Sequence, residues 1–272
     1  MGKLDGKVAI VTTARGLGRA YAKGLAGLGA KVSVADLDLK SYREFDAEAQ
    51  DMTAESTVAE IEAAGGAAIG IELDVRDQQA VETMVARVVE QWGPVDVLVA
   101  NAGGGRGRPV DTKASTIDPA LLDLVVGMNL YGTVYCCNAV APIMRSQRSG
   151  KIITVSSVAG LSPSADGGYA HYGAAKAAIA HYTRYLAQDL GPFGITANCI
   201  APGVIATGRI MQTVIPSSSS SNRDRAEQVA LRRLGSVEDC ARVVEFLATD
   251  LSDYVSGAVI PWGPRSCARY RV

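Results

Sequence analysis

The sequence predicts an α/β fold built on a parallel sheet. Short runs rich in β-branched residues alternate with segments of helical apolar spacing along most of the 272 residues. Runs without polar alternation are typical of strands buried on both faces, as in parallel sheets. A glycine turn follows the first run and an aspartate ends the second. Strand, glycine turn, helix and strand in this order predict a βαβ unit that binds a dinucleotide.

The first βαβ unit is expected at the start of the chain. Residues 7–12 read Lys-Val-Ala-Ile-Val-Thr and predict a buried strand. Residues 19–28 have helical spacing, which Gly29 ends, and residues 31–36 predict the second strand.

The turn between the first strand and its helix carries the features of a pyrophosphate site. Glycines let the backbone approach a ligand closely, and the helix start at Arg15–Gly18 offers amide hydrogens and a positive dipole end. Asp36 follows Gly16 by about 20 residues, where a carboxylate can accept hydrogen bonds from an adenosine ribose. Such a carboxylate would repel a 2′-phosphate and favours NAD over NADP. Arg15 favours NADP weakly, and Asp36 outweighs it.

A long polar connection follows the second strand. Residues 37–53 are polar and acidic, and only residues 55–64 have a clear helical pattern. The connection is longer than a crossover loop and helix require. We favour a solvated insertion over a segment that contacts substrate or another subunit.

The next strand pair places polar and small residues at one edge of the sheet. Strands are expected over 67–73, followed by Asp74-Val75, and over 95–100, with a helix over 77–92 between them. Asn101-Ala-Gly-Gly-Gly105 follows the second of these strands. Ligands of open α/β sheets lie at the carboxyl ends of the strands. Gly103 would therefore let a cofactor pass close to the backbone, although a plain turn would look the same.

The second half of the chain continues the alternation. Helices are expected over 119–146, after residue 169 and over 237–249, with strands over 151–156, 195–200 and 258–261. Asn129 lies inside the first helix, where packing or a kink is the favoured interpretation and a water-holding role the alternative. Ser156-Ser157 ends a strand, which allows a hydroxyl to point into the crevice. Five serines at 217–221 predict either a disordered loop or a mobile lid, expected over 207–228.

Tyr172 and Lys176 form the candidate acid/base pair. Residues four apart lie on one face of a helix, about 6 Å apart along the axis. A lysine ammonium stabilises a phenolate, which lowers the tyrosine pKa toward the working pH. Two ordinary helix-surface residues would show the same spacing, so the motifs around the pair decide its meaning.

Composition narrows the function further. The chain is 48% hydrophobic with a net charge of −1, which fits one domain over 1–272 and gives no electrostatic case for nucleic acid or an anionic membrane. No apolar run reaches transmembrane length, and the N-terminus lacks a signal-peptide core. The five cysteines show no metal or redox spacing and suit a reducing cytoplasm, and two histidines are too few for a typical His-based metal site, so no metal is expected.

In combination, these motifs make the chain resemble the short-chain dehydrogenases/reductases from Leu4 to about Ile260. The motifs that carry the resemblance are the glycine turn, Asp74-Val75, Asn101-Ala102-Gly103, Asn129, Ser157, Tyr172-x-x-x-Lys176 and Pro202-Gly203-x-x-x-Thr207. The resemblance implies a Rossmann-like, doubly wound parallel sheet of about seven strands in a single domain, a nicotinamide cofactor and a homotetramer or homodimer formed through the Asn129 and Tyr172 helices.

The resemblance also implies the role of each site residue. Tyr172 would exchange a proton with the oxygen of a small alcohol or ketone, and Ser157 would orient that oxygen. Lys176 would bind the ribose and lower the tyrosine pKa, and Asn129 would anchor a relay water. Asp36 would bind the adenosine ribose and Asp74 the adenine. The remaining cofactor contacts are expected from Thr12, Arg15, Gly16, Leu17, Gly18, Val75, Asn101, Ala102, Gly103, Pro202, Gly203, Ile205 and Thr207.

The chain departs from the family pattern in three places. The family turn is Thr-Gly-x-x-x-Gly-x-Gly, whereas Thr12 to Gly18 lacks the first glycine and is one residue short. Ser157 precedes Tyr172 by two residues more than is usual in the family, and a bulge over 161–168 is expected to absorb them. The last strand is followed by an atypical run from Pro261 and a basic tail.

We therefore expect an NAD-dependent oxidoreductase that interconverts a secondary alcohol and a ketone. The altered glycine turn motivates an alternative, a catalytically weak relative that acts as a binding or scaffold protein. A lyase or epimerase that uses the same cofactor is a third hypothesis, which the Ser157, Tyr172 and Lys176 set gives no reason to prefer.

Overall fold

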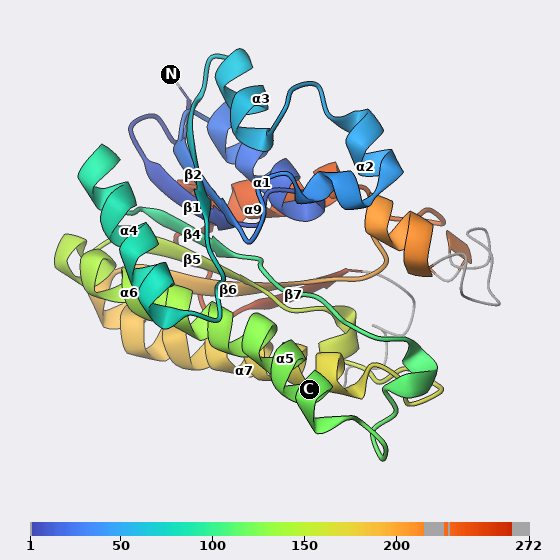
Figure 1. The fold of residues 1–272 in the computed structure, drawn as a ribbon. Helices are drawn as coiled ribbons and strands as arrows, with labels where there is room; N and C mark the ends of the chain where they lie inside the picture. Colours follow the sequence, from blue (N-terminus) through green and yellow to red (C-terminus); the bar gives the residue numbers. More distant parts are fainter. Residues whose placement is uncertain (1, 215–225, 228, 263–272) are drawn as a thin grey trace.

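The fold is organised around one parallel sheet (Figure 1). The structure, a computed structural model, describes residues 2–214, 226–227 and 229–262. Seven strands pair in the order β3-β2-β1-β4-β5-β6-β7, all in parallel. They are β1 Val8–Thr12, β2 Lys31–Asp36, β3 Ala67–Glu72, β4 Val97–Ala100, β5 Gly150–Val155, β6 Ile195–Pro202 and β7 Val259–Trp262. The predicted α/β class and strand positions are confirmed.

Helices cover both faces of the sheet, as the doubly wound prediction requires. One layer contains α1 (Gly16–Gly27), α3 (Thr57–Ala63) and α9 (Val237–Ala248). The other contains α4 (Gln78–Trp92), α5 (Pro119–Val126), α6 (Gly132–Gln147) and α7 (Ala170–Leu190). Short 3-10 segments are η1 Ser41–Glu44, η2 Pro109–Asp111, η4 Val158–Gly160, η5 Gly191–Phe193 and η7 Asp250–Ser252.

Strand alternation divides the core into two halves. In β1, Val8 and Ile10 belong to the cluster under α4, α6 and α7, whereas Ala9 and Val11 belong to the cluster under α1 and α9. Successive strand side chains point to opposite faces. A run that is apolar at every position therefore becomes a strand buried on both sides, which fixes β1 in the middle of the sheet.

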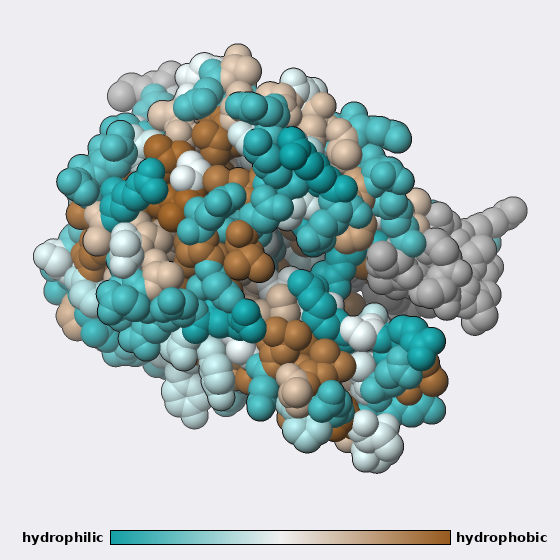
Figure 2. Space-filling view, viewed as in Figure 1, coloured by the Kyte–Doolittle hydropathy of each residue, from teal (hydrophilic) through white to brown (hydrophobic). Residues whose placement is uncertain are grey.

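The predicted helix over 119–146 consists of α5, a π-helical segment η3 (Gly127–Tyr131) and α6. The combined stretch Pro119–Gln147 is long and apolar enough to cross a membrane by those criteria alone, which differs from the expectation drawn from the sequence. Those criteria are weak evidence, because the core helix of a soluble protein passes the same test. Here α6 packs on β4, β5 and α4, and apolar atoms gather on the surface over α5 (Figure 2).

The polar connection after β2 contains more structure than its sequence predicts. The segments η1 and α2 (Asp46–Asp51) precede α3, and α2 lies beside η6 (Ile210–Val214) at the carboxyl edge of the sheet (Figure 1). Gln212 Nε2 donates to Asp46 Oδ2 at 3.4 Å across this contact. The connection thus reaches the segment after β6. The five serines at 217–221, most of the proposed lid and the tail from residue 263 lie outside the described residues.

Candidate active site

A cavity of about 880 Å³ opens at the carboxyl ends of the strands. The sheet order reverses between β1 and β4, and ligands of open α/β sheets bind at such a point. The cavity is lined by the sequence-predicted residues Arg15, Gly16, Leu17, Asp36, Asp74, Val75, Asn101, Ala102, Gly103, Ser157, Tyr172, Lys176, Pro202, Gly203, Ile205 and Thr207. Thr12, Gly18 and Asn129 were also predicted but do not line it.

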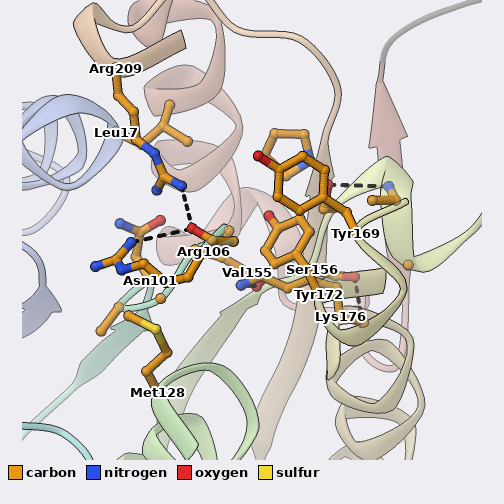
Figure 3. Close-up of a pocket in the computed structure, with 18 of the residues that line it drawn as sticks. Leu17, Asn101, Arg106, Met128, Val155, Ser156, Tyr169, Tyr172, Lys176 and Arg209 are labelled. Atoms are coloured by element: carbon orange, nitrogen blue, oxygen red, sulfur yellow. Dashed lines mark hydrogen bonds between the residues drawn. The ribbon is translucent and has the colours of Figure 1, made fainter. Parts of the chain in front are cut away.

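Tyr172 and Lys176 lie next to each other on the first turns of α7 (Figure 3). The Lys176 ammonium is 5.7 Å from the centre of the Tyr172 ring and donates a hydrogen bond to the Val155 carbonyl at 2.7 Å. Its side chain is buried, with 3% of the residue exposed. Burial lowers the pKa of Lys176 to about 8, because the charged form loses hydration. The predicted adjacency of the pair is confirmed.

The pKa of Tyr172 differs in direction from the expectation. Burial raises it above the ordinary value, while a hydrogen bond with Ser157 and the positive charge of Arg209 act in the opposite direction. Lys176 is not among these causes. The protein part of the site therefore keeps Tyr172 protonated near neutral pH, with Ser157 and Arg209 as the groups that ease its ionisation.

The two serines after β5 have different tasks. Ser156 is buried, and its hydroxyl donates to the Lys176 carbonyl at 2.7 Å, which ties the strand to α7. The Ser157 hydroxyl accepts from the Ala159 amide at 3.2 Å and lines the cavity. Its hydrogen bond with Tyr172 shows that the two extra residues before Tyr172 do not separate the pair.

Asn129 holds the loop after β4. Its side-chain oxygen accepts from the Gly104 amide at 2.9 Å, and its side-chain nitrogen donates to the Gly104 carbonyl at 3.0 Å and the Val125 carbonyl at 2.8 Å. It lies in the π-helical segment, so the favoured kink-and-packing interpretation agrees with the structure. Gly103 passes so close to this side chain that an added Cβ would lie 2.3 Å from its oxygen.

Sequence and structure comparisons agree with this geometry. Residues 11–262 match a family model described as enoyl-(acyl carrier protein) reductase. The chain is 52% identical over 259 residues to cyclohexanol dehydrogenase of Rhodococcus sp. (strain TK6), with 95% of each chain covered. It is 35% identical to sorbitol dehydrogenase of Cereibacter sphaeroides, covering 93% of this chain and 94% of that one. The crystal structure of gox2181 superposes with a TM-score of 0.83, 32% identity and 96% of each chain covered.

The chain belongs to the short-chain dehydrogenase/reductase family. Within this family its glycine turn is unusual, and the structure shows how the shorter turn is built. Thr13 adopts a φ of 133°, in the region that favours glycine, and Gly16 has a φ of 51°. The Thr13 hydroxyl accepts a hydrogen bond from the Asn101 side chain, which connects this strained residue to the loop after β4.

Two residues expected to contact the cofactor, Thr12 and Gly18, contact other protein atoms around the glycine turn. The Thr12 hydroxyl accepts from the Asn101 and Ala102 amides, each at 2.9 Å. A Cβ at Gly18 would lie 2.2 Å from the Thr13 hydroxyl. Both residues therefore pack against the turn and do not line the cavity, and their contact with the cofactor stays a prediction.

At the adenosine end of the family cleft, Asp36 and Asp74 have protein partners. Asp36 Oδ2 accepts from the Ala14 amide at 2.7 Å and from the Ser41 hydroxyl at 3.3 Å. The Arg76 guanidinium binds both oxygens of Asp74 and lowers the pKa of that carboxyl. Both aspartates line the cavity.

Among the lining residues that the sequence did not single out, three make contacts that shape the cleft. Glu48 comes from α2, so the interpretation of the connection as only solvated is wrong at this position. Arg209 Nη2 donates to the Gly105 carbonyl at 2.6 Å across the cleft (Figure 3). Tyr169 has a φ of 56° and donates its hydroxyl to the Gly107 carbonyl at 3.0 Å. Each acts on a segment distant in sequence, for which local patterns give no signal.

Proposed function

We propose that the protein oxidises a small secondary alcohol, such as an alicyclic alcohol of the cyclohexanol kind, to the ketone with NAD. The observation that carries the proposal is the meeting of Ser157, Tyr172 and Lys176 at the carboxyl edge, beside the glycine turn of a βαβ unit. The relatives named as cyclohexanol and sorbitol dehydrogenases support an alcohol substrate.

In the proposed reaction each side chain acts on a stated atom. The Ser157 hydroxyl donates to the substrate oxygen and orients it. The Tyr172 phenolate accepts the hydroxyl proton, and the Ser157 hydroxyl and the Arg209 charge ease its formation. Lys176, which also lines the cavity, would bind the cofactor ribose. When bound, nicotinamide would supply the acceptor for the hydride from the carbinol carbon. Placing the two reactants side by side lowers the barrier by an amount that can reach about 7–11 kcal/mol.

The residues at the adenosine end fit NAD better than NADP. Asp36 ends β2, and Asp38 and Glu44 of the following connection also line the cavity, so a 2′-phosphate beside Asp36 would meet negative charge. The Arg15 guanidinium pairs with Glu44 at 3.4 Å and Glu48 at 3.6 Å. Arg15, the one residue that argued for NADP, is thus engaged by carboxylates of this chain.

Part of the cavity wall suits an apolar substrate. Ala114, Leu124, Met128, Leu161 and Ile210 are among the residues that line the cavity. Apolar walls favour an alicyclic alcohol because they gain from burial of its ring. We also propose that the protein forms a homodimer or homotetramer. A reducing compartment is proposed as well, since the four described cysteines are free and buried.

The decisive experiment measures NAD reduction by absorbance with a panel of secondary alcohols that includes cyclohexanol. Tyr172→Phe should lower kcat/KM by about 10³-fold, within the range typical of a lost acid/base group. Tyr185→Phe, a change at an exposed tyrosine on the same helix, should leave it unchanged. Absence of turnover with every alcohol, together with absence of NAD binding by calorimetry, would refute the proposal.

A further inference from the structure

Glu48 lies where the glycine turn meets the segment after β6. An added Cβ on Gly16 would be 3.4 Å from Glu48 Oε1, and one on Gly208 would be 2.5 Å from Glu48 Cγ. The Arg209 amide approaches Oε1 at 3.4 Å. Glu48 is thus wedged between the two walls of the cleft, although it comes from the connection after β2.

The carboxylate is buried and incompletely partnered. Only 9% of its side chain is exposed. Oε2 has no hydrogen bond and has the Arg15 guanidinium at 3.6 Å. A buried carboxylate oxygen without a hydrogen bond is costly, because its lost hydration is not replaced. Such an oxygen is stabilised here by the positive surroundings that it faces.

Those surroundings include the start of α1. This 12-residue helix begins at Gly16, has no side-chain cap and has no acidic residue in its first turn. The amide hydrogens and dipole of a helix start favour an anion. Glu48 is therefore the anion that this chain itself brings to the turn.

We propose that Glu48 is a built-in competitor of the cofactor's phosphates and sets the affinity of the protein for dinucleotide. This inference rests on the proposed use of NAD. A pyrophosphate at the turn would bring negative charge against the Glu48 carboxylate, and both would compete for Arg15 and the α1 amides. Binding of the dinucleotide therefore requires Glu48 to leave, which breaks the contact of α2 with Gly208 and Arg209 and couples cofactor binding to that segment.

The test measures binding by calorimetry at fixed ionic strength with two probes, inorganic pyrophosphate and NADH. Glu48→Gln keeps the size of the side chain and removes its charge. Asp46→Asn is the matched control, because it removes one charge from an exposed position of the same helix that does not line the cavity. Glu48→Gln should bind both probes about tenfold more tightly than wild type, and Asp46→Asn should stay within about twofold, since tenfold corresponds to about 1.4 kcal/mol.

The outcomes separate this inference from the proposed function. Pyrophosphate binding that is unchanged in Glu48→Gln, or absent in all variants, overturns the competitor role even if NADH binds. Tighter pyrophosphate binding without any NADH binding supports the role of Glu48 and overturns the dehydrogenase proposal. An equal gain in Glu48→Gln and Asp46→Asn overturns the inference as well, because general charge then explains the effect.

Discussion

Individual side chains set the proton chemistry of the site. Burial raises the pKa of Tyr172, and the neighbouring hydroxyl and guanidinium oppose that effect. Lys176 contributes a buried ammonium whose own pKa is lowered to about 8. The tyrosine and lysine are found by their spacing, whereas Arg209 joins them only through the turn of the chain after β6.

Arg209 should control the pH at which the proposed alcohol oxidation begins. Its positive charge lowers the pKa of Tyr172, so its removal raises that pKa. Alcohol oxidation needs the phenolate, and kcat/KM therefore rises with pH through this ionisation. In Arg209→Met the inflection of the kcat/KM profile should move to higher pH, whereas Arg209→Lys should move it less. Equal profiles for wild type and Arg209→Met would contradict this role.

At the scale of elements, tight contacts between a turn and the helix that follows it shape the cofactor half. The strained Thr13 fits only because α1 begins without a side chain at Gly18. The π-helical segment between α5 and α6 has a related effect, since it presents Asn129 to the loop after β4. The packing of Thr13 on Gly18 and the π-helical segment both position backbone atoms at the edge of the cleft.

Two glycines of α1 provide a matched pair of substitutions. Gly18→Ala should lower the free energy of unfolding by about 1–3 kcal/mol, because its Cβ would collide with Thr13. Gly27→Ala meets no atom within 4 Å and should raise that free energy by about 0.5–1 kcal/mol through helix propensity. Urea unfolding followed by circular dichroism measures both changes. Equal effects would show that the turn yields to an added methyl group.

At the scale of the whole molecule, two exposed tyrosines lie in the helical layer that contains α7, and we call the surface of this layer the tyrosine face. Tyr131 is 51% exposed and Tyr185 67% exposed, and their elements η3 and α7 pack together. Exposed aromatic residues are typical of protein interfaces. This face is where we expect two copies of the chain to associate.

Replacement of both tyrosines should break that association. In Tyr131→Glu/Tyr185→Glu, burial of two carboxylates without partners would oppose contact between copies. Light scattering after size-exclusion chromatography should give a smaller mass than for wild type. Val110→Glu, at an exposed apolar residue of η2, should keep the wild-type mass. A wild-type protein that elutes as a monomer would contradict the assembly.

The sequence by itself determined the strands, most helices and the family, because burial imposes the period of each element on local residues. It located Ser157, Tyr172 and Lys176 through spacing within one strand end and one helix. It did not show that Thr12 binds the loop after β4 or that Gly18 packs against Thr13, since both contacts depend on the folded arrangement of these segments. Only the tertiary structure decided that Glu48 enters the cleft and that Arg209 reaches the Gly105 carbonyl. Their partners are far away in the chain, and long-range contacts leave no periodic signal in the segments that make them.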